Sequence, residues 1–453
     1  MNINRRFVIK NITIAVMIIV ISLAGCSEKP ELYELSHFQS ERTLKQNREK
    51  FKEQLINKTI LSTIATPVDS VEAERWQGAL WALGLSGYRD PFVQQKLTAQ
   101  LRIFDDLDAG LQRSLLEAVY TYHDTLFRDE ISGVVRNVSS PNLFAMAVLY
   151  LHRAFKYQQA AEYLELLSVR FPDWQENPIL IMLTNQLQNE SVKLPPIIDI
   201  FTHSLPGNYP VLFSLQREER SYPGITIIKN SKGNFLRDAD STIFYIRHLT
   251  RAASNLPGYL TNGNTPQGIY SLQSMDVSRN VFIGPTPNLQ TRLPFEALPD
   301  GFFHSVRSDT SWELALYRNL LPASWQNYLP VYEAYYAGMA GRSQIIAHGT
   351  TIDPEFYRDQ PYYPFTPSLG CLTAMELWSA ENGNLVYSDQ LKLVNALLTA
   401  DALNGYLIVL ELDDQKKPVE LSEILVYIQT AESAAQLAFV SDYRKIKATD
   451  DAE

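Results

Sequence analysis

The chain is poor in the residues that build metal sites and disulfide frameworks. It has 2 cysteines and 7 histidines among 453 residues. No two histidines stand at i, i+4 spacing with a glutamate, and no paired cysteines offer zinc ligands. No glycine-rich stretch ends in the Gly-Lys-Ser/Thr of a phosphate-binding loop. We therefore expect no metal and no other cofactor.

The chain also lacks an excess of basic residues. Its formal net charge is −10, which argues against binding nucleic acid, where a basic face is expected. Hydrophobic residues make up 45% and charged residues 20%, as in ordinary globular proteins. The length leaves room for two or three domains and a sizeable core.

The N-terminus has the pattern of a secretory signal. Basic residues Arg5 and Arg6 precede an apolar run, residues 11–25, that is too short for a comfortable membrane span. The run ends in Leu-Ala-Gly-Cys and resembles a bacterial lipobox, which implies cleavage after residue 25 and lipidation of Cys26. Ser27 after the cysteine then favours the outer membrane. We expect a protein held by lipid on the periplasmic side of that membrane; the alternative is an uncleaved anchor with a chance cysteine.

Lipidation of Cys26 leaves Cys371 without a partner in the chain. The periplasm is oxidising, and a disulfide-stabilised protein would show an even set of cysteines. An unpaired thiol there is a hazard unless it is buried or used. Two interpretations remain at this point, a buried cysteine that acts as a small hydrophobe and a catalytic nucleophile.

The rest of the chain divides by pattern into a multidomain α + β protein. Residues 26–66 are polar and predict a tether followed by a solvated helix. Residues 67–195 place apolar residues at helical spacing in irregular HEAT- or TPR-like pairs, either a concave surface for a protein partner or a packed spacer. Residues 196–426 have short alternating runs and predict a mostly β domain. Residues 427–453 predict a C-terminal helical tail.

Chemistry concentrates late in the β domain. The strand-like "QIIA" runs into His348, and "TPSLG" leads to Cys371. An imidazole can take the proton of a thiol whose ordinary pKa is near 8.5 and hold the thiolate as an ion pair. Gly370 allows backbone to approach a substrate carbonyl closely. The stretch after Cys371, "LTAMELWSA", has helical character, so we expect the thiol to lie near a helix N-terminus.

Three short stretches then resemble the L,D-transpeptidase (YkuD-type) catalytic domain. They are "TPQGI" at 265–269, "HG" at 348–349 and "SLGCL" at 368–372, in the order that the family shows. The resemblance covers roughly residues 205–425 and leaves the helical region outside. It implies a mostly β catalytic domain that acts on peptidoglycan stem peptides, releases D-Ala and carries the stem as a thioester. An amine then forms a 3→3 cross-link or a protein tether.

The resemblance also implies residue roles. Cys371 would be the nucleophile and His348 the base that activates it. The carbonyl of Gly349 would orient the imidazole, and the N–H groups of Gly370 and Cys371 would form the oxyanion site. No metal is needed.

Substrate-binding residues follow less directly from the motif. We place Ser368, Thr350 and Arg342 in this group. Many members have a basic residue at the position of Leu369 and Arg or Asn at that of Thr373, so this chain lacks a charge there. Arg342 and Arg358 are the candidates to hold a substrate carboxylate instead; the alternative for each is an ordinary surface residue.

Residues 285–330 lengthen the domain beyond the compact family core. The segment is rich in proline and aromatics, and we interpret it as an insertion that either roofs the cleft or packs against the helical domain. His304 lies in it, and we assign it no catalytic part.

Two other functions remain open. One is hydrolysis, in which water resolves the thioester, as in an L,D-carboxypeptidase or an enzyme that cleaves lipoprotein from peptidoglycan. The other is a non-catalytic cell-wall-binding scaffold.

Overall fold

The structure is a computed structural model that describes residues 31–68, 72–122, 125–188, 193–307 and 310–450. The chain divides into two compact units, Met1–Tyr33 and Glu34–Glu453, and every element below lies in the second. The signal sequence and the lipidation site predicted at Cys26 lie outside the described residues. Among the described residues, no helix is both long and apolar enough to cross a membrane.

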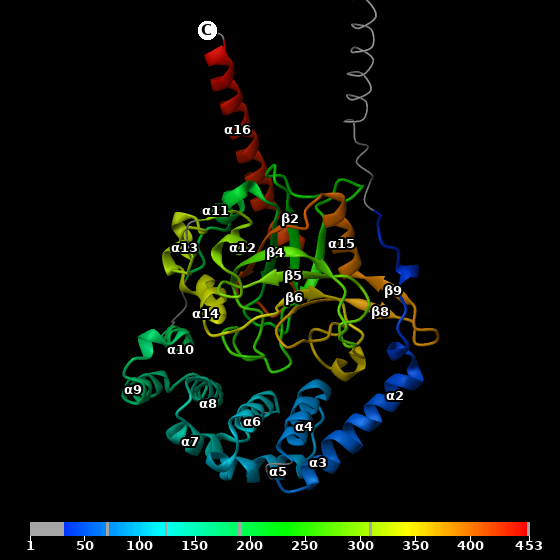
Figure 1. Ribbon diagram of the computed structural model, residues 1–453, viewed down its shortest axis with the longest axis vertical. Coiled ribbons are helices and arrows are strands. Elements are labelled where there is room, and N and C mark those ends of the chain that lie inside the picture. Colours follow the sequence, from blue (N-terminus) through cyan, green and yellow to red (C-terminus); the bar gives the residue numbers. More distant parts are fainter. Residues whose placement is uncertain (1–30, 69–71, 123–124, 189–192, 308–309, 451–453) are drawn as a thin grey trace, which may run out of the picture. The chain divides into compact units, whose positions relative to one another are not determined.

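Helices α2 to α10 follow one another in an arc along one side of a β-barrel (Figure 1). Their bounds are α2 (Lys45–Glu53), a π-helix labelled η3 (Gln54–Leu61), α3 (Ser62–Ala65), α4 (Ala73–Ser86), α5 (Pro91–Arg102), α6 (Ala109–Tyr122), α7 (Arg128–Asn137), α8 (Pro141–Ala154), α9 (Ala160–Arg170) and α10 (Pro178–Gln188).

Local sequence explains several ends of these helices. The Asp90 side chain caps α5 by accepting from the N–H of Phe92 at 2.7 Å, and proline opens α5 and α8 at the first helical position. Gly87 ends α4 in the left-handed conformation with φ +60°. Capping and breaking residues therefore set the lengths of these helices.

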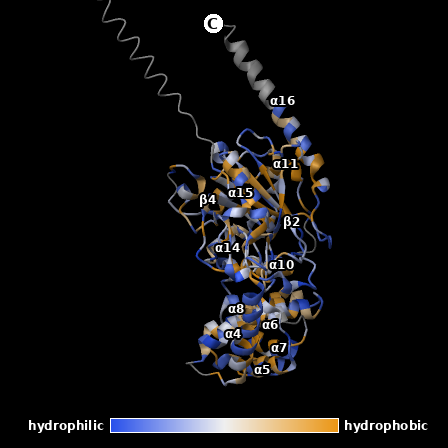
Figure 2. Ribbon diagram, turned by 90° about the vertical axis from the view of Figure 1, so that its right-hand side faces the viewer, coloured by the Kyte–Doolittle hydropathy of each residue, from blue (hydrophilic) through white to orange (hydrophobic). Residues whose placement is uncertain are grey.

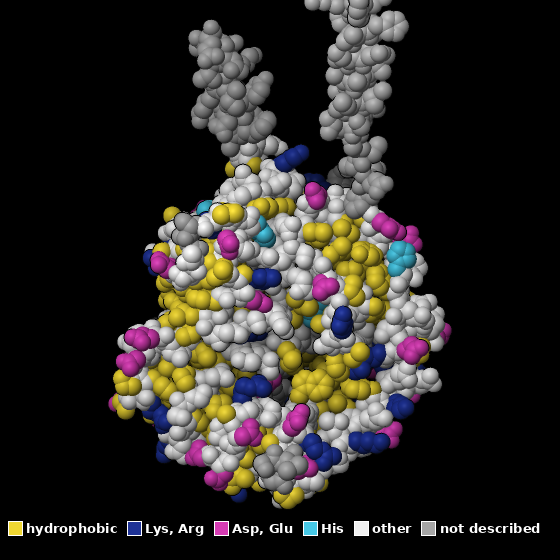
Figure 3. Space-filling view, viewed as in Figure 1, with side chains coloured by type: hydrophobic (Ala, Val, Ile, Leu, Met, Phe, Trp, Pro, Cys, Tyr) yellow, Lys and Arg dark blue, Asp and Glu magenta, His cyan; other side chains and the backbone are white. Residues whose placement is uncertain are grey.

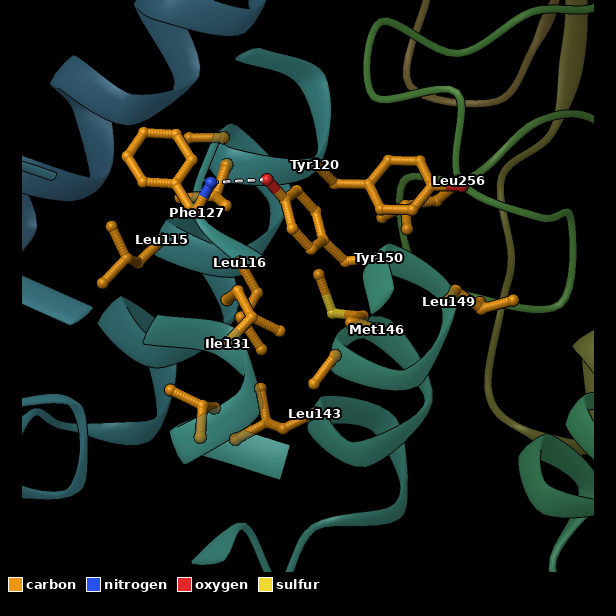
Figure 4. Close-up of a cluster of buried hydrophobic side chains, with 14 of the residues drawn as sticks. Leu115, Leu116, Tyr120, Phe127, Ile131, Leu143, Met146, Leu149, Tyr150 and Leu256 are labelled. Carbon is orange, nitrogen blue, oxygen red and sulfur yellow. Dashed lines mark hydrogen bonds between the residues drawn. The ribbon is translucent and has the colours of Figure 1, made fainter. Parts of the chain in front are cut away.

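The helical arc has its own hydrophobic core, to which a loop of the barrel contributes buried residues. The Tyr150 hydroxyl accepts from the N–H of Phe127 at 2.8 Å inside this core (Figure 4). Leu256, Tyr259 and Leu260, from the loop after β3, are buried in the same cluster. Burial of apolar side chains is the main favourable term in folding, so this loop is fastened to the helices by the core itself.

Eight strands close into a barrel in the order β1-β10-β4-β5-β6-β7-β3-β2. They are β1 (Val211–Gln216), β2 (Gly224–Lys229), β3 (Tyr245–Leu249), β4 (Gly268–Asp276), β5 (Asn288–Arg292), β6 (Ile346–His348), β7 (Leu372–Ala374) and β10 (Gly405–Glu411); β8 (Glu376–Trp378) and β9 (Leu385–Ser388) form a separate hairpin. Two neighbouring pairs are parallel, β1 with β10 and β6 with β7.

The barrel strands are rich in apolar residues, and pairing into a barrel buries these side chains. All six residues of β1 and all six of β2 are buried. Figure 2 shows hydrophobic residues along β2 and around α5 and α7. The second core joins these strands to helices packed outside them, α11 (Ile197–Thr202), α12 (Pro299–Phe303), α13 (Leu314–Arg318), α14 (Glu333–Met339) and α16 (Leu425–Asp450); α15 (Asp389–Thr399) contacts β3 and β5. A mixed α + β architecture is thus present.

Short 3-10 turns complete the elements. They are η1 (Leu35–His37), η2 (Glu41–Thr43), η4 (Phe104–Asp106), η5 (Trp174–Glu176), η6 (Pro206–Asn208), η7 (Ala323–Trp325), η8 (Leu329–Tyr332), η9 (Pro354–Tyr357) and η10 (Leu421–Glu423).

The segment predicted as a tether and solvated helix needs a correction. Helix α2 contains no buried residue. Beyond it, however, Leu55, Ile60 and Ile64 are buried in the core of the helical arc. The Arg42 guanidinium also lies 4.0 Å from the ring centre of Phe282. Residues 34–66 are therefore a packed part of the domain, because sparse apolar residues found partners in other helices.

The predicted insertion needs a correction too. Residues 288–292 form β5, which pairs with β4 and β6 and so belongs to the barrel. Of the described residues between 285 and 330, Gln290 alone lines the main cavity, while Phe302 and Trp325 are buried in the barrel core. The segment does not roof the cleft.

Candidate active site

His348 and Cys371 lie on two adjacent parallel strands. His348 is the last residue of β6, and Cys371 immediately precedes β7. His348 pairs in register with Thr373. Residues two apart on a strand point to the same face, so Cys371 and His348 share a face, offset by two residues or about 7 Å along the strands. The fold therefore brings together the two residues that the motifs single out.

The imidazole of His348 is buried and held at one nitrogen. Its Nδ1–H donates to the Gly349 carbonyl at 2.5 Å, which assigns the proton to Nδ1 and leaves the lone pair on Nε2. Burial lowers the pKa of His348 to about 4, against the opposing effect of the Gly349 carbonyl. The ring is therefore neutral at physiological pH, and Nε2 is ready to accept a proton.

The thiol of Cys371 is partly exposed and points toward the start of β6. Sγ donates to the Gln344 carbonyl at 3.6 Å. Burial raises the pKa of Cys371, and the N–H of Ile346 and the charge of Arg342 act in the opposite direction. Among the described residues, no hydrogen bond joins Sγ to His348. The resting thiol is protonated, and a turn about the Cα–Cβ bond of Cys371 is needed to direct it toward the imidazole.

Both side chains open into one large cavity of about 1010 Å³. A hollow bordered by hydrophobic side chains is visible on the face shown in Figure 3. Its lining comes from the barrel end and, opposite, from helices α4 and α6. The helical arc therefore supplies one wall of the site, which the sequence did not indicate.

Gly370 leaves room for a buried cation behind the thiol. Its φ of +122° lies in the region that favours glycine, and a Cβ there would stand 2.0 Å from an Arg342 nitrogen. The Arg342 guanidinium donates to the carbonyls of Gly258, Gly263 and Asn264. The glycine beside the cysteine thus admits a charge that favours the thiolate.

Gly349 likewise leaves room for a buried carboxyl, that of Glu376. The sequence analysis did not single out this residue. A Cβ at Gly349 would stand 2.1–2.3 Å from the carboxyl atoms of Glu376. Glu376 accepts from the N–H of Thr350 at 2.9 Å and from Ser388 Oγ at 2.8 Å. Burial raises its pKa to about 7. A lone acid inside the apolar run "LTAMELW" was the one available signal.

No family model, no curated protein and no solved structure matches this chain.

The assignment of the site therefore depends on its own geometry. Among the described residues, no group of three or more His, Cys, Asp or Glu side chains is arranged to hold a metal ion.

The helix predicted after Cys371 is wrong. Residues 372–374 and 376–378 are strands β7 and β8. Leu372 and Ala374 are buried, and strand pairing with β6 and β3 overrides the helix propensity of this run. The thiol is therefore not placed at a helix N-terminus.

The three predicted substrate-binding residues line the cavity, but their polar groups already have partners. Ser368 Oγ accepts from the N–H of Gly370 at 3.1 Å and donates to the Cys371 carbonyl at 3.0 Å. Thr350 Oγ1 accepts from Ile352 and Thr366. The Arg342 guanidinium is held by backbone carbonyls, as described above. These three residues stabilise the local turns. Because the Gly370 N–H already donates to Ser368 Oγ, the Cys371 N–H is the predicted oxyanion donor that remains.

The two departures from the family pattern have different surroundings. Leu369 lines the cavity with 46% of its surface exposed. Thr373 is buried beside His348, and its hydroxyl has no hydrogen-bond partner among the described residues. His304, which was given no catalytic part, contacts Ser271 Oγ and the Gly405 carbonyl away from the cavity.

Proposed function

We propose that this chain is a cysteine acyltransferase, an L,D-transpeptidase that acts on peptidoglycan stem peptides. One observation carries the proposal. A neutral imidazole with its Nδ1 held by a carbonyl and a partly exposed thiol share one face of two paired strands and one cavity. An activated nucleophile needs its base within hydrogen-bond reach, and a turn of the Cys371 side chain within this cavity would supply that contact.

The first half-reaction forms a thioester. His348 Nε2 takes the proton of Cys371, and the thiolate attacks the carbonyl that joins the L-centre of the diamino acid to D-Ala. The Cys371 N–H and the nearby Arg342 charge stabilise the oxyanion and the thiolate. The imidazolium then protonates the leaving nitrogen, the C–N bond breaks, and D-Ala departs.

The second half-reaction transfers the stem to an amine. The amine attacks the thioester carbonyl while His348 takes its proton. The C–S bond breaks, the thiolate regains a proton from the imidazolium, and the new amide is released. Attack by water in place of the amine gives trimming.

The finer identity of the domains belongs to the same proposal. The barrel would be an L,D-transpeptidase-like catalytic domain and the arc a HEAT- or TPR-like region. Lipidation at Cys26 would hold the protein on the periplasmic side of the outer membrane, within reach of the cell wall.

One observation favours a second function, the non-catalytic scaffold that binds stem peptides. The thiol is directed at Gln344, away from the imidazole, and burial raises its pKa. A cavity of this size would bind a peptide without any chemistry.

The two functions are separated by a mass measurement. The purified protein is incubated with disaccharide-tetrapeptide, and free D-Ala and the intact protein mass are followed. An acyltransferase releases D-Ala and gains the mass of the acyl group, and Cys371→Ala does neither. Unchanged substrate and unmodified wild-type protein would leave the scaffold as the function. A carbapenem provides a second acylating probe of the same thiol.

A further inference from the structure

The helical wall of the cavity is built from one stripe of each of two helices. On α4 the lining residues are Gln77, Leu80, Trp81, Gly84 and Leu85, spaced i, i+3, i+4, i+7 and i+8. On α6 they are Arg113, Ser114, Glu117, Ala118 and Thr121, a stripe of the same kind. Such spacing places residues on a single helix face. One face of α4 and one face of α6 therefore line the same cavity as the strand ends that carry the thiol.

This wall combines open space with an aromatic surface. A Cβ added at Gly84 would meet nothing within 4 Å. Trp81 keeps 39% of its surface exposed and lies edge-on to Phe282 with ring centres 5.5 Å apart. Cavities for drug-sized ligands measure roughly 300–1,000 Å³. The cavity volume of about 1010 Å³ thus leaves room for a second peptide end beside an acylated cysteine.

The wall also carries a pair of opposite charges. Arg113 and Glu117 form an ion pair at 2.9 Å, one turn apart on α6. Within the part of the chain that the structure describes, they and Arg342 are the Lys, Arg, Asp or Glu side chains that line the cavity. Arg342 is engaged by three backbone carbonyls. The α6 pair is therefore the charge available to a ligand on the wall opposite the thiol.

Glu117 is held in place by the barrel. The amide of Asn262 donates to both carboxylate oxygens, at 3.2 and 3.0 Å. Burial raises the pKa of Glu117 in spite of these bonds and of Arg113. A carboxylate short of solvation gains from a further cation, such as an ammonium group. Arg113, 30% exposed at its side chain, has guanidinium donors left for a carboxylate.

We propose that Arg113 and Glu117 form the acyl-acceptor subsite and bind a free α-amino acid end, Arg113 taking the carboxylate and Glu117 the ammonium on the same carbon. This inference rests on the proposed transpeptidase function and names the amine that resolves the thioester. An acceptor whose amine lies far from any carboxylate, such as a protein lysine, fits this subsite less well.

The test separates acceptor from donor chemistry. The protein is loaded with disaccharide-tetrapeptide, and thioester formation is measured first by intact mass. Glycine and glycinamide are then offered as acceptors, since they differ in the carboxylate. The ratio of the two amide products is compared between proteins, which cancels the intrinsic reactivity of each amine.

We expect Arg113→Gln to lower the glycine-to-glycinamide ratio about tenfold, the effect of losing a charge-assisted hydrogen bond. Glu117→Gln should slow transfer to both amines. Thioester formation should be unchanged in both variants, which also shows that they are folded. Glu130→Gln, which breaks a comparable ion pair with Arg102 (3.5 Å) away from the cavity, should leave the ratio as in the wild type.

A charge swap tests whether the pair is only structural. The double variant Arg113→Glu with Glu117→Arg keeps an ion pair at the same helical spacing. A structural role predicts that the swap restores the wild-type ratio, and this result would overturn the subsite; the subsite predicts no recovery. An unchanged ratio in Arg113→Gln would overturn it as well. Absence of any thioester in the wild type would instead refute the transferase function itself.

Discussion

The turn that carries His348 and the turn that carries Cys371 each have a glycine next to the functional residue, but the ionisable groups behind the two glycines are of opposite type, one acidic and one basic. Behind Gly349 lies the carboxyl of Glu376, and behind Gly370 lies the guanidinium of Arg342. A carboxylate favours an imidazolium, and a guanidinium favours a thiolate. At Gly370, burial raises the pKa of Cys371 and the admitted guanidinium acts to lower it, whereas the carboxyl admitted at Gly349 has its pKa raised by burial to about 7 and is only partly charged at neutral pH.

The backbone at the two glycines differs in one further respect. Gly370 has φ +122°, and Gly349 does not have positive φ. The first position therefore excludes a side chain for two reasons, conformation and space, and the second for space alone.

The largest expected effect concerns the reacting groups themselves. Cys371→Ala should abolish acylation, because no other cysteine follows Cys26 in the chain. His348→Ala should retain a residual rate, about 10²- to 10⁴-fold lower, as is typical when a general base is lost. Intact mass after timed incubation with a carbapenem measures both. Equal acylation rates for wild type and His348→Ala would show that His348 does not act as the base for Cys371.

The next effect separates conformation from space at the two glycines. Gly370→Ala should lose about 1–3 kcal/mol from backbone strain alone, and the collision with Arg342 adds to this. Gly349→Ala should be destabilised by its collision with Glu376. Adding Glu376→Ala to Gly349→Ala should relieve the collision, whereas adding Arg342→Ala to Gly370→Ala should leave the strain. Denaturant unfolding of the four proteins measures this, and full recovery in both pairs would contradict the distinction.

The third effect is a pH dependence of stability from Glu376. Its folded pKa of about 7 exceeds the ordinary value near 4.3. The native state therefore binds an extra proton between these values, so this group destabilises the fold progressively as pH rises toward 7. From pH 5 to 8, Glu376→Gln should gain about 2.5 kcal/mol in free energy of unfolding relative to wild type. If the thermal midpoints of wild type and Glu376→Gln changed in parallel with pH, the Glu376 carboxyl would not be a source of the pH dependence.

The smallest effect is on the thiol. Arg342→Met removes the cation near Cys371 and should raise the thiol pKa further, whereas Arg342→Lys keeps the charge and serves as the control. The rate of alkylation by iodoacetamide against pH reports the thiolate fraction. Glu376→Gln should not move this curve, because its carboxyl lies behind the other turn. A shift in the Glu376 variant equal to that of Arg342→Met would show that the two turns are not independent.

The sequence predicted the parts of the fold in which local pattern and burial agree. The region 196–426, predicted as mostly β, contains the apolar strands at 211–216, 224–229 and 405–411, and the helical spacing of 67–195 produced helices between residues 73 and 188. It did not predict β5, because "NLQTR" has no apolar alternation and is a strand through its neighbours. It misassigned 372–378 as a helix for the converse reason, since pairing outweighed propensity.

The site was predicted unevenly for a related reason. Motif spacing selected His348 and Cys371, which the strands bring to one face. It could not select Glu376 or the α6 pair, which reach the site only through tertiary packing. A polar stripe such as Arg113 to Thr121 has the same pattern whether it faces water or a cavity. The local pattern of residues 34–66 predicts a solvated segment because it has few apolar side chains, and the partners that bury them belong to other helices.

The parallel pair of β1 with β10 has a consequence for how the molecule is made. β1 spans residues 211–216 and its partner 405–411, so the ring of strands stays open until residues 405–411 have been synthesised. Contacts so distant along the chain form slowly, whereas helix pairs such as α7 and α8 are made from neighbouring residues. The helical arc is therefore able to fold first. It then provides a surface against which the barrel closes when β10 pairs with β1.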